Sequence, residues 1–425
     1  MMVGALFVVG LLIGAAVVYV AKPSGTSSST ASTGLPPVVN IGLLDDFTDG
    51  LSSIGIRINA SANQATTDIN NWLQTTSLAG KVTFHVVPLD YALDSTKALT
   101  DMNTFKSQGI TVVVGPLNSG TAGALLQFAN SNQIVLISPS STSPALGIAN
   151  DYLFRTAPTD VHQGAADARM MYQSGAKAII IVYRQDSYGS GLDNYTKARF
   201  TALGGTVAAE IPYDTTTTNF APVVAQITSA WTAASQKYGA NSVAIDEIAF
   251  EELGPLLLAA KTASSPILST PLPWFGDDGI ADDNVVTNST YASVVSQIRL
   301  PSTIFGYTNS SKTATLCSQI LAATHQTCES YSLGSYDDVW LAALSIINCG
   351  TTAGSCIQKE ISSVAANYYG VTGWTLLDPN GDRAAGDFLV WCVTGSANTA
   401  SWNLCGSWSA QADSVAWTAK PSGIA

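Results

Sequence analysis

Short polar side chains follow two apolar runs in the first half of the chain. Asn118 and Ser119 come after TVVVGPL, and Ser141 and Thr142 come after IVLISPS. Hydroxyls and free backbone N–H groups at the start of a helix bind anions such as carboxylates. The spacing therefore indicates an anion site, although each of these residues taken alone is also typical of an ordinary helix cap.

Aromatic and acidic side chains follow apolar runs farther along the chain. Tyr188 comes after IIIVYRQ, Phe250 ends VAIDEIAF, and Asp277 and Asp278 follow PLPWFG. Carboxylates and aromatic rings both bind ammonium groups. Together with the anion site, these aromatic and acidic residues would complement the two charges of an α-amino acid. The alternative is that Asp277-Asp278-Gly279 is only a turn signal.

The hydrophobic pattern places these residues at the ends of strands. Apolar runs predict strands, and runs with helical spacing predict helices between them. The strands are expected at 38–44, 81–90, 111–117, 134–140, 177–184, 205–213 and 242–250, and the helices at 53–72, 94–108, 119–130, about 160 onward, 188–203, 220–237 and 252–263. Strict alternation predicts doubly wound parallel sheets, and ligands bind such sheets beyond the carboxyl ends of the strands. A break at about 155–158, within the connector YLFRTAP, predicts two α/β lobes with a cleft between them.

The N-terminus predicts a membrane or export segment. Residues 1–22 begin with a run that carries no charged side chain up to Ala21 and is about long enough to span a bilayer. An uncleaved anchor and a cleaved signal peptide both fit this run. Residues 23–37 are rich in serine, threonine, glycine and proline, and we expect them to form a flexible linker.

Cysteines and glycosylation sequons agree with a compartment outside the cytoplasm. An even number of cysteines beside an export signal favours disulfides. Nearest-neighbour pairing is the simplest of fifteen possible pairings, and it joins Cys317–Cys328, Cys349–Cys356 and Cys392–Cys405. Four sequons make a glycoprotein possible outside the cell, and they begin at Asn59, Asn194, Asn288 and Asn309.

Composition and motifs argue against several functions. The chain has a formal charge of −12 and no basic run, which disfavours nucleic acid as a partner. We find no nucleophile elbow, Walker loop, dinucleotide fingerprint or zinc motif, so we expect no enzyme, cofactor or metal site. Adjacent acids usually mark solvated turns, and we expect this of Asp45-Asp46, Glu251-Glu252 and Asp277-Asp278.

The same segments resemble a known family. NIGLL, VVVGPLNSGTAGALL, VLISPSSTSPAL, YLFRTAP, YRQDSYGSGL and TGWTLLDPNGD occur in order over residues 38–395. They are similar to the type 1 periplasmic-binding fold, in its branched-chain amino-acid and amide-binding branch. The resemblance implies an extracytoplasmic receptor of an ABC importer, with permease subunits as partners. Its small-molecule ligand would be an amino acid, most simply branched-chain, or an amide or urea-like compound.

Carried over by position, the resemblance assigns roles to individual residues. Ser119, Ser141 and Thr142 would hold the ligand carboxylate, and Asp278 or Asp277 its ammonium group. Tyr188 and, less directly, Phe250 would be the aromatics of the second lobe. Two features depart from the family: Ile54 replaces an aromatic residue, and the frequent first-lobe disulfide is absent.

The resemblance also implies a hinge. Crossovers near 157, 301 and 387 would divide the chain into lobe 1, at 38–157 plus 302–386, and lobe 2, at 158–301 plus 387–425. Ligand binding would close the lobes on the extracellular face of the membrane. The alternative is a ligand-sensing protein, or a structural or adhesive surface protein, that uses the same fold.

Overall fold

The computed structural model describes residues 34–307, 309–384, 386–396 and 399–424. Within these residues the strands form a five-stranded sheet, an eight-stranded sheet and a two-stranded sheet. We call the first two of these the first and second sheets. The expected membrane segment at 1–22 lies outside the described residues, as does the linker up to residue 33.

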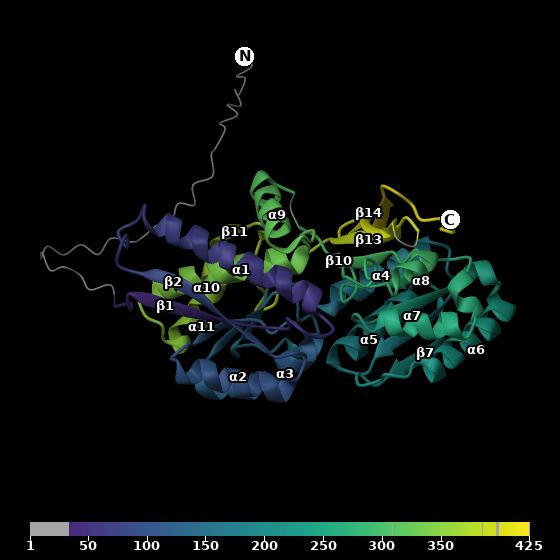
Figure 1. Ribbon diagram of the computed structural model, residues 1–425, viewed down its shortest axis with the longest axis horizontal. Helices are drawn as coiled ribbons and strands as arrows, with labels where there is room; N and C mark the ends of the chain where they lie inside the picture. The colour runs from purple at the N-terminus through teal and green to yellow at the C-terminus, as the bar shows by residue number, and fades with distance from the viewer. Residues whose placement is uncertain (1–33, 308, 385, 397–398, 425) are drawn as a thin grey trace, which may run out of the picture. The chain divides into compact units, whose positions relative to one another are not determined.

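The first sheet is wholly parallel, with strand order β2-β1-β3-β4-β5. Its strands are β1 (Val38–Asp45), β2 (Thr83–Asp90), β3 (Val112–Val114), β4 (Val135–Ser138) and β5 (Leu153–Arg155). Helices α1 (Ser52–Leu73), α10 (Ser330–Cys349) and α11 (Gly354–Asn367) cover one face. Helices α2 (Ser95–Ser107) and α3 (Ser119–Asn132) cover the other, as Figure 1 shows.

The alternation of side chains along β1 explains why both faces are covered. Ile41 and Leu43 pack into the core that contains α1 and α10, whereas Leu44 packs with α2 and α3. All three are fully buried. A parallel strand that is apolar on both faces needs a helical layer on each side.

The second sheet has the order β15-β14-β13-β10-β9-β8-β6-β7. Its parallel part comprises β6 (Ala178–Arg184), β7 (Thr206–Tyr213), β8 (Val243–Ile248), β9 (Trp274–Gly276) and β10 (Ser302–Phe305). Helices α4 (Asp160–Gln173) and α5 (Ser187–Ala202) cover one face. Helices α6 (Ala221–Tyr238), α7 (Leu253–Thr262) and α8 (Ala292–Ile298) pack against the other.

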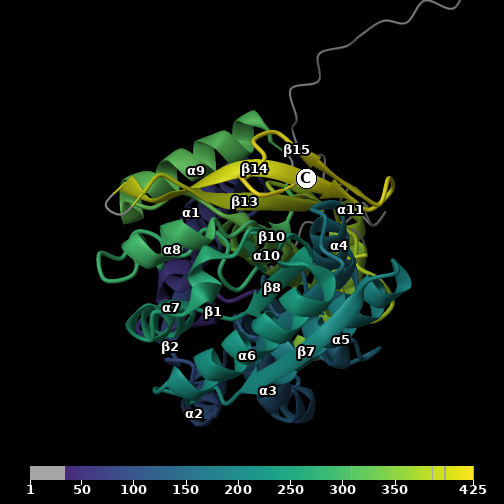
Figure 2. The same cartoon turned by 90° about the vertical axis from the view of Figure 1, so that its right-hand side faces the viewer.

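The C-terminal strands extend the second sheet in the antiparallel sense. They are β13 (Phe388–Thr394), β14 (Ser401–Ser409) and β15 (Ser414–Trp417), and Figure 2 shows them as a yellow ribbon along one edge of the molecule. The segments joining them are much shorter than a parallel crossover requires. The second sheet is therefore mixed, whereas the sequence analysis expected a parallel sheet.

The remaining elements connect the two sheets. Helix α9 (Ser311–Thr324) leads from β10 to α10, and a small hairpin of β11 (Tyr369–Gly370) and β12 (Gly373–Trp374) follows α11. Short 3-10 turns lie at Pro144–Leu146, Ala240–Ser242 and Pro266–Ser269. Among the described helices, no single one is long and apolar enough to cross a membrane. Helices α10 and α11 together have the required length and composition, but the chain bends sharply between them.

The α/β class with parallel sheets and the expected helices are confirmed, and two details differ. The connector YLFRTAP contains strand β5, which is only three residues long and so shows no periodicity. Strand β10 belongs to the second sheet, although the expected boundary at 301 placed it with the first. The structure contains the three expected disulfides, Cys317–Cys328, Cys349–Cys356 and Cys392–Cys405.

Because β1 is an interior strand of the first sheet, substitutions on it test which of its side chains belong to the core. We expect Leu43→Ala to lower the free energy of unfolding by about 2–5 kcal/mol, because Leu43 is fully buried and its truncation leaves a cavity in the core. Val38→Ala is the matched control on the same strand, since Val38 is 52% exposed. Urea titration checks both, and an equal loss in the two variants would contradict the assigned core.

Candidate functional site

A small cavity lies where strand ends of both sheets meet. Its volume is about 20 Å³, which is room for about one water molecule. Leu51, Leu117 and Ser140 line it from the side of the first sheet, and Gly279 lines it from the second. The expected site residues that line it are Asn118, Ser119, Tyr188, Phe250 and Asp278. The other three, Ser141, Thr142 and Asp277, are buried and do not line it.

Ser119 is oriented by two hydrogen bonds from the segment after β4. It begins α3 after strand β3, and its Oγ accepts hydrogen bonds from the backbone N–H groups of Thr142 and Ser143, both at 3.1 Å. These bonds occupy the acceptor sites of the hydroxyl and leave its proton free to be donated. Together with the N-terminus of α3, this arrangement favours an anionic group in the cavity.

The segment after β4 supplies further hydroxyls. Ser140 Oγ donates to the Leu117 carbonyl at 2.8 Å, whereas the buried Oγ of Ser141 has no hydrogen-bond partner among the described residues. Ser138 Oγ accepts from Ser141 N at 2.9 Å and so fixes the turn that carries these residues. The expected cluster of Ser119, Ser141 and Thr142 therefore forms, with Ser140 in its lining.

Tyr188 and two aspartates form the opposite wall. The Tyr188 hydroxyl lies 2.7 Å from Asp277 Oδ1 and 2.7 Å from Asp278 Oδ1, and it accepts from Gly279 N at 3.2 Å. One hydroxyl proton cannot satisfy two carboxylates at once. A side chain at position 279 would collide with the Ala249 carbonyl, so glycine permits this close approach.

The aromatic rings of the second sheet stack on each other. Tyr188 and Phe250 lie with ring centroids 5.4 Å apart and planes at 18°. The Arg184 guanidinium sits 3.5 Å from the Phe250 centroid and pairs with Asp186 and Glu252. The stacking of Tyr188 on Phe250 and the hydrogen bonds of its hydroxyl together hold this side chain in place.

Two polar residues of the site were missed by the sequence analysis. Tyr331, at the start of α10, hydrogen-bonds to Asp278 Oδ2. Asp160, at the start of α4, is fully buried, and neither of its carboxylate oxygens has a partner with good hydrogen-bond geometry. An acid in the first turn of a helix is ordinary, so the sequence held no signal that Asp160 faces Thr142 and Asp278.

Burial raises the pKa of the carboxyl groups in this region, so they hold their protons to a higher pH than usual. It raises the pKa of Asp160 and Asp277 well above the ordinary value, and the charge of Asp278 adds to the effect in both. The pKa of Asp278 is also raised by burial, although hydrogen bonds from Tyr331 and Tyr188 oppose the rise. No lysine or arginine lines the cavity among the described residues.

Two of the three adjacent acid pairs are not solvated turns, contrary to expectation. Asp45 and Asp46 are buried, and Asp46 accepts hydrogen bonds from the backbone of Asp49 and Leu51 that shape the turn into α1. Asp277 and Asp278 are buried as described above. Sequence alone cannot distinguish a solvated pair from one that organises a buried loop.

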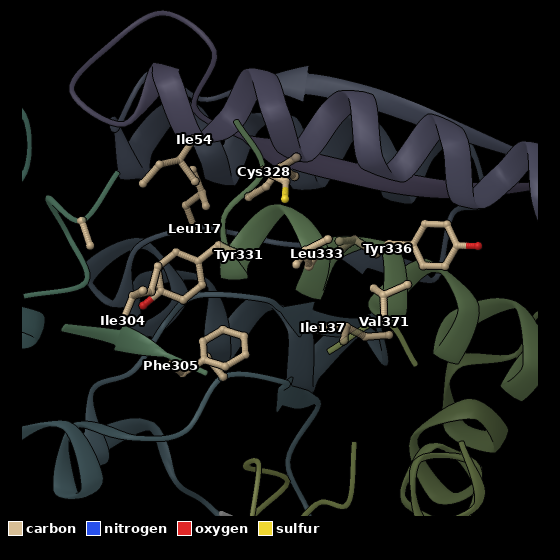
Figure 3. Packing of buried hydrophobic residues seen from close by; sticks show 14 of the residues in the cluster. Ile54, Leu117, Ile137, Ile304, Phe305, Cys328, Tyr331, Leu333, Tyr336 and Val371 are labelled. Carbon is tan, nitrogen blue, oxygen red and sulfur yellow. The ribbon is translucent and has the colours of Figure 1, made fainter. Parts of the chain in front are cut away.

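An aliphatic wall completes the cavity. Leu51 and Ile54 of the α1 N-terminal region and Leu117 of the loop after β3 line it opposite Phe250. Figure 3 shows Ile54, Leu117 and Tyr331 close together below α1. Ile54 stands where the resemblance led us to note a missing aromatic, so an aliphatic side chain fills this position of the wall.

A wider vestibule of about 730 Å³ lies beside the small cavity and shares Asn118 with it. Its lining is acidic and comes from both sheets, with Asp49 and Asp94 on one side and Asp186, Glu251 and Glu252 on the other. The Tyr91 hydroxyl donates to Asn118 Oδ1 at 2.7 Å and holds this side chain between the two spaces.

Comparison with known families identifies the fold. Residues 57–396 match the family described as the receptor family ligand binding region. The chain belongs to this family. The chain has the type 1 periplasmic-binding fold, which agrees with the parallel sheets and the strand-end cavity of this structure.

Individual relatives point to binding proteins. An uncharacterised protein of Methanocaldococcus jannaschii is 28% identical over 96% of this chain and 98% of its own length. The Leu/Ile/Val-binding protein BraC3 of Rhizobium johnstonii is 27% identical over 42% of this chain and 49% of its length. The leucine-binding protein LivK of Thermotoga maritima has a TM-score of 0.70 at 20% identity, covering 86% of this chain and 97% of that one.

Two buried acids, one on helix α5 and one on strand β8, predict that the protein is most stable in acid. Burial raises the pKa of Asp193 to about 7 and that of Asp246 to about 8, against an ordinary value of 3.8. The folded state therefore binds these protons more tightly than the unfolded chain. The free energy of unfolding should be greatest below about pH 4 and fall as the pH rises to about 8.

Urea titrations from pH 4 to pH 9 measure this slope. Asp246→Asn should flatten it, because the amide does not titrate. Asp214→Asn is the control: Asp214 is exposed, and hydrogen bonds from Thr216 lower its pKa, so it titrates below this window. A wild-type stability that rises between pH 5 and pH 8 would contradict the assignment.

Proposed function

We propose that this protein is the substrate-binding receptor of an ABC importer and that its ligand is a branched-chain amino acid. The observation that carries the proposal is the cavity in which hydroxyl donors, carboxylates and an aliphatic wall face one another. This arrangement supports ligand capture and offers no arrangement of groups for catalysis. The relatives named as Leu/Ile/Val-binding and leucine-binding proteins support the same ligand class.

The ligand's two charged ends would occupy opposite walls. Its carboxylate would lie at the N-terminus of α3 and accept hydrogen bonds from the hydroxyls of Ser119, Ser141 and Thr142. Its ammonium group would lie between Asp278 and Asp160 and would balance the negative charge of these two acids. Its aliphatic side chain would pack on Ile54, Leu117 and Phe250.

The present cavity is too small for such a ligand, so binding requires the walls to separate. We propose two lobes, at 38–157 plus 306–386 and at 158–305 plus 387–425, which move about a hinge of three chain segments. The position of β10 in the second sheet supports the boundary at about 305. The ligand would bind the first lobe, and closure would bring Tyr188 and Asp278 onto it.

The remaining parts of the proposal concern location and partners. Residues 1–22 would anchor or export the protein, and 23–37 would tether the lobes at the extracellular face of the membrane. The three disulfides support an oxidising compartment. Closed lobes would then present one surface to the permease subunits, which release the ligand into their channel.

The experiment that tests the proposal is a thermal-shift screen of residues 34–425 against leucine, isoleucine, valine, amides, urea, benzoate and sugars. A ligand at a hundredfold excess over its dissociation constant stabilises the folded state by about 2.7 kcal/mol. We expect the melting temperature to rise with the branched-chain amino acids. No rise with any compound, in a well-folded sample, would favour the alternative of a structural or adhesive surface protein.

A substitution in the site tests the ammonium assignment. We expect Asp278→Asn to weaken leucine binding roughly tenfold or more, because a hydrogen bond to a charged group is lost. Asp246→Asn is the control, since Asp246 is buried but does not line the cavity. Isothermal titration calorimetry measures both, and equal affinities in the two variants would refute the role of Asp278.

A further inference from the structure

A buried ion pair joins the helices of the first sheet to the second sheet, outside the cavity. Arg57 lies on α1 and is 1% exposed. Its Nη1 donates to Asp282 Oδ2 at 3.0 Å, and its Nη2 donates to the Asp282 carbonyl at 2.9 Å. Asp282 follows β9 and belongs to the same segment as Asp278. The pair therefore connects the wall that carries Ile54 to the wall that carries Asp278.

A third segment completes the contact. Thr327, between α9 and α10, offers its carbonyl to Arg57 Nη1 at 3.1 Å and its hydroxyl to Asp282 Oδ2 at 2.9 Å. Glu329 caps the start of α10 and has an oxygen 4.0 Å from Arg57 Nε. Three separate parts of the chain thus meet at one guanidinium group.

A disulfide fixes the Thr327 segment. Cys328 follows Thr327 and is bonded to Cys317 of α9. Figure 3 shows Cys328 below α1, near Ile54 and Tyr331. The bond ties the end of the α9–α10 connection back to α9, so the carbonyl and hydroxyl of Thr327 are held facing Arg57 and Asp282.

The ion pair accompanies other contacts between the same walls. Glu251 N, beyond β8, donates to the Gly50 carbonyl before α1 at 3.3 Å. Tyr331 of α10 bonds to Asp278. Among these contacts, the Arg57–Asp282 pair alone joins two opposite charges and leaves the cavity lining untouched.

We propose that Arg57, Asp282 and Thr327 form a latch that holds the cleft closed over its ligand, and that the Cys317–Cys328 disulfide positions this latch. The latch does not touch the ligand, but it sets how long the ligand stays bound. This inference rests on the proposed function, because it assigns the closed state to ligand retention. Arg57, Asp282 and Thr327 are positioning residues.

The position of the Arg57–Asp282 pair determines which rate constant of ligand binding it affects. Loss of one partner from a buried, hydrogen-bonded charge pair acts mainly on dissociation, because the pair forms only after the walls meet. The association rate depends on the open state, in which the pair contributes nothing. A role in folding alone would lower stability and leave both rate constants of the folded protein unchanged.

Stopped-flow binding of leucine to the full soluble chain, residues 34–425, tests the latch. We expect Arg57→Met and Asp282→Asn each to raise the dissociation rate about tenfold or more and to leave the association rate within about twofold. The double variant should dissociate no faster than the singles, because both remove the same interaction. Arg57→Lys should have a dissociation rate between those of wild type and Arg57→Met.

A partly exposed ion pair beside the second sheet serves as the control. Arg169 of α4 pairs with Asp413, which precedes β15, and neither residue lines the cavity or the vestibule. Arg169→Met should lower the melting temperature and leave the dissociation rate unchanged. Equal dissociation rates in wild type, Arg57→Met and Arg169→Met would overturn the latch.

Removal of the disulfide gives a second measurement. The Cys317→Ser/Cys328→Ser variant should raise the dissociation rate in the same direction as Arg57→Met. The Cys392→Ser/Cys405→Ser variant removes the disulfide between β13 and β14, and it should leave that rate unchanged. A faster rate in both variants, or in neither, would refute the positioning role of Cys317–Cys328.

A ligand-free measurement separates failure of the latch from failure of the proposed function. Fluorophores at the exposed positions Leu99 of α2 and Leu258 of α7 report the distance between the two sheets' outer helices. We expect Arg57→Met to shift this distance distribution to longer values and Arg169→Met to leave it unchanged. If wild type binds no amino acid but this shift occurs, the function fails and the latch stands; if no shift occurs, the latch fails.

Discussion

The site depends on a shortage of positive charge around buried carboxyls. Tyr188 offers one proton to Asp277 and Asp278, and Tyr331 offers another to Asp278. Burial makes the ionised forms costly, and no cationic side chain lines the cavity in the described chain. These carboxyl groups therefore hold their protons to a higher pH than exposed ones do. Under the proposed function, the cost of ionising them links the charge of the ligand to closure of the cleft.

The fold supplies the geometry that this constraint needs. Parallel strands end at the same edge of a sheet, so β3 and β4 deliver hydroxyls while β6, β8 and β9 deliver aromatics and acids. Two such edges face each other, and opposite chemistries meet without any long side chain. The hydroxyl of Ser119 and the carboxyl of Asp278 come from residues far apart in sequence but line one cavity.

Much of this arrangement could be predicted because it is periodic. Helices α1 to α7 were predicted from apolar residues at helical spacing, and the strand ends of that part of the chain from the alternation of runs; helices α8 to α11 were not predicted. Residues whose role depends on tertiary contacts could not be found in this way. Asp160 looks like a normal first-turn acid, and Tyr331 lies in a polar segment without periodicity. Asp45 and Asp46 look like a solvated turn, whereas their hydrogen bonds organise a buried loop. In each case, burial decides the role, and burial is not visible in local sequence.

The chain path has a consequence for the order in which the protein assembles. Helix α1 packs its buried face on α10, which lies more than two hundred residues later in the chain. The parallel part of the second sheet likewise leaves the edge of β10 open until β13 arrives. Neither layer is complete before the last third of the polypeptide is made, and all six cysteines lie in that third. A nascent chain would therefore keep its apolar surfaces unmatched until late in synthesis, so that both layers can be completed only after most of the polypeptide has been made.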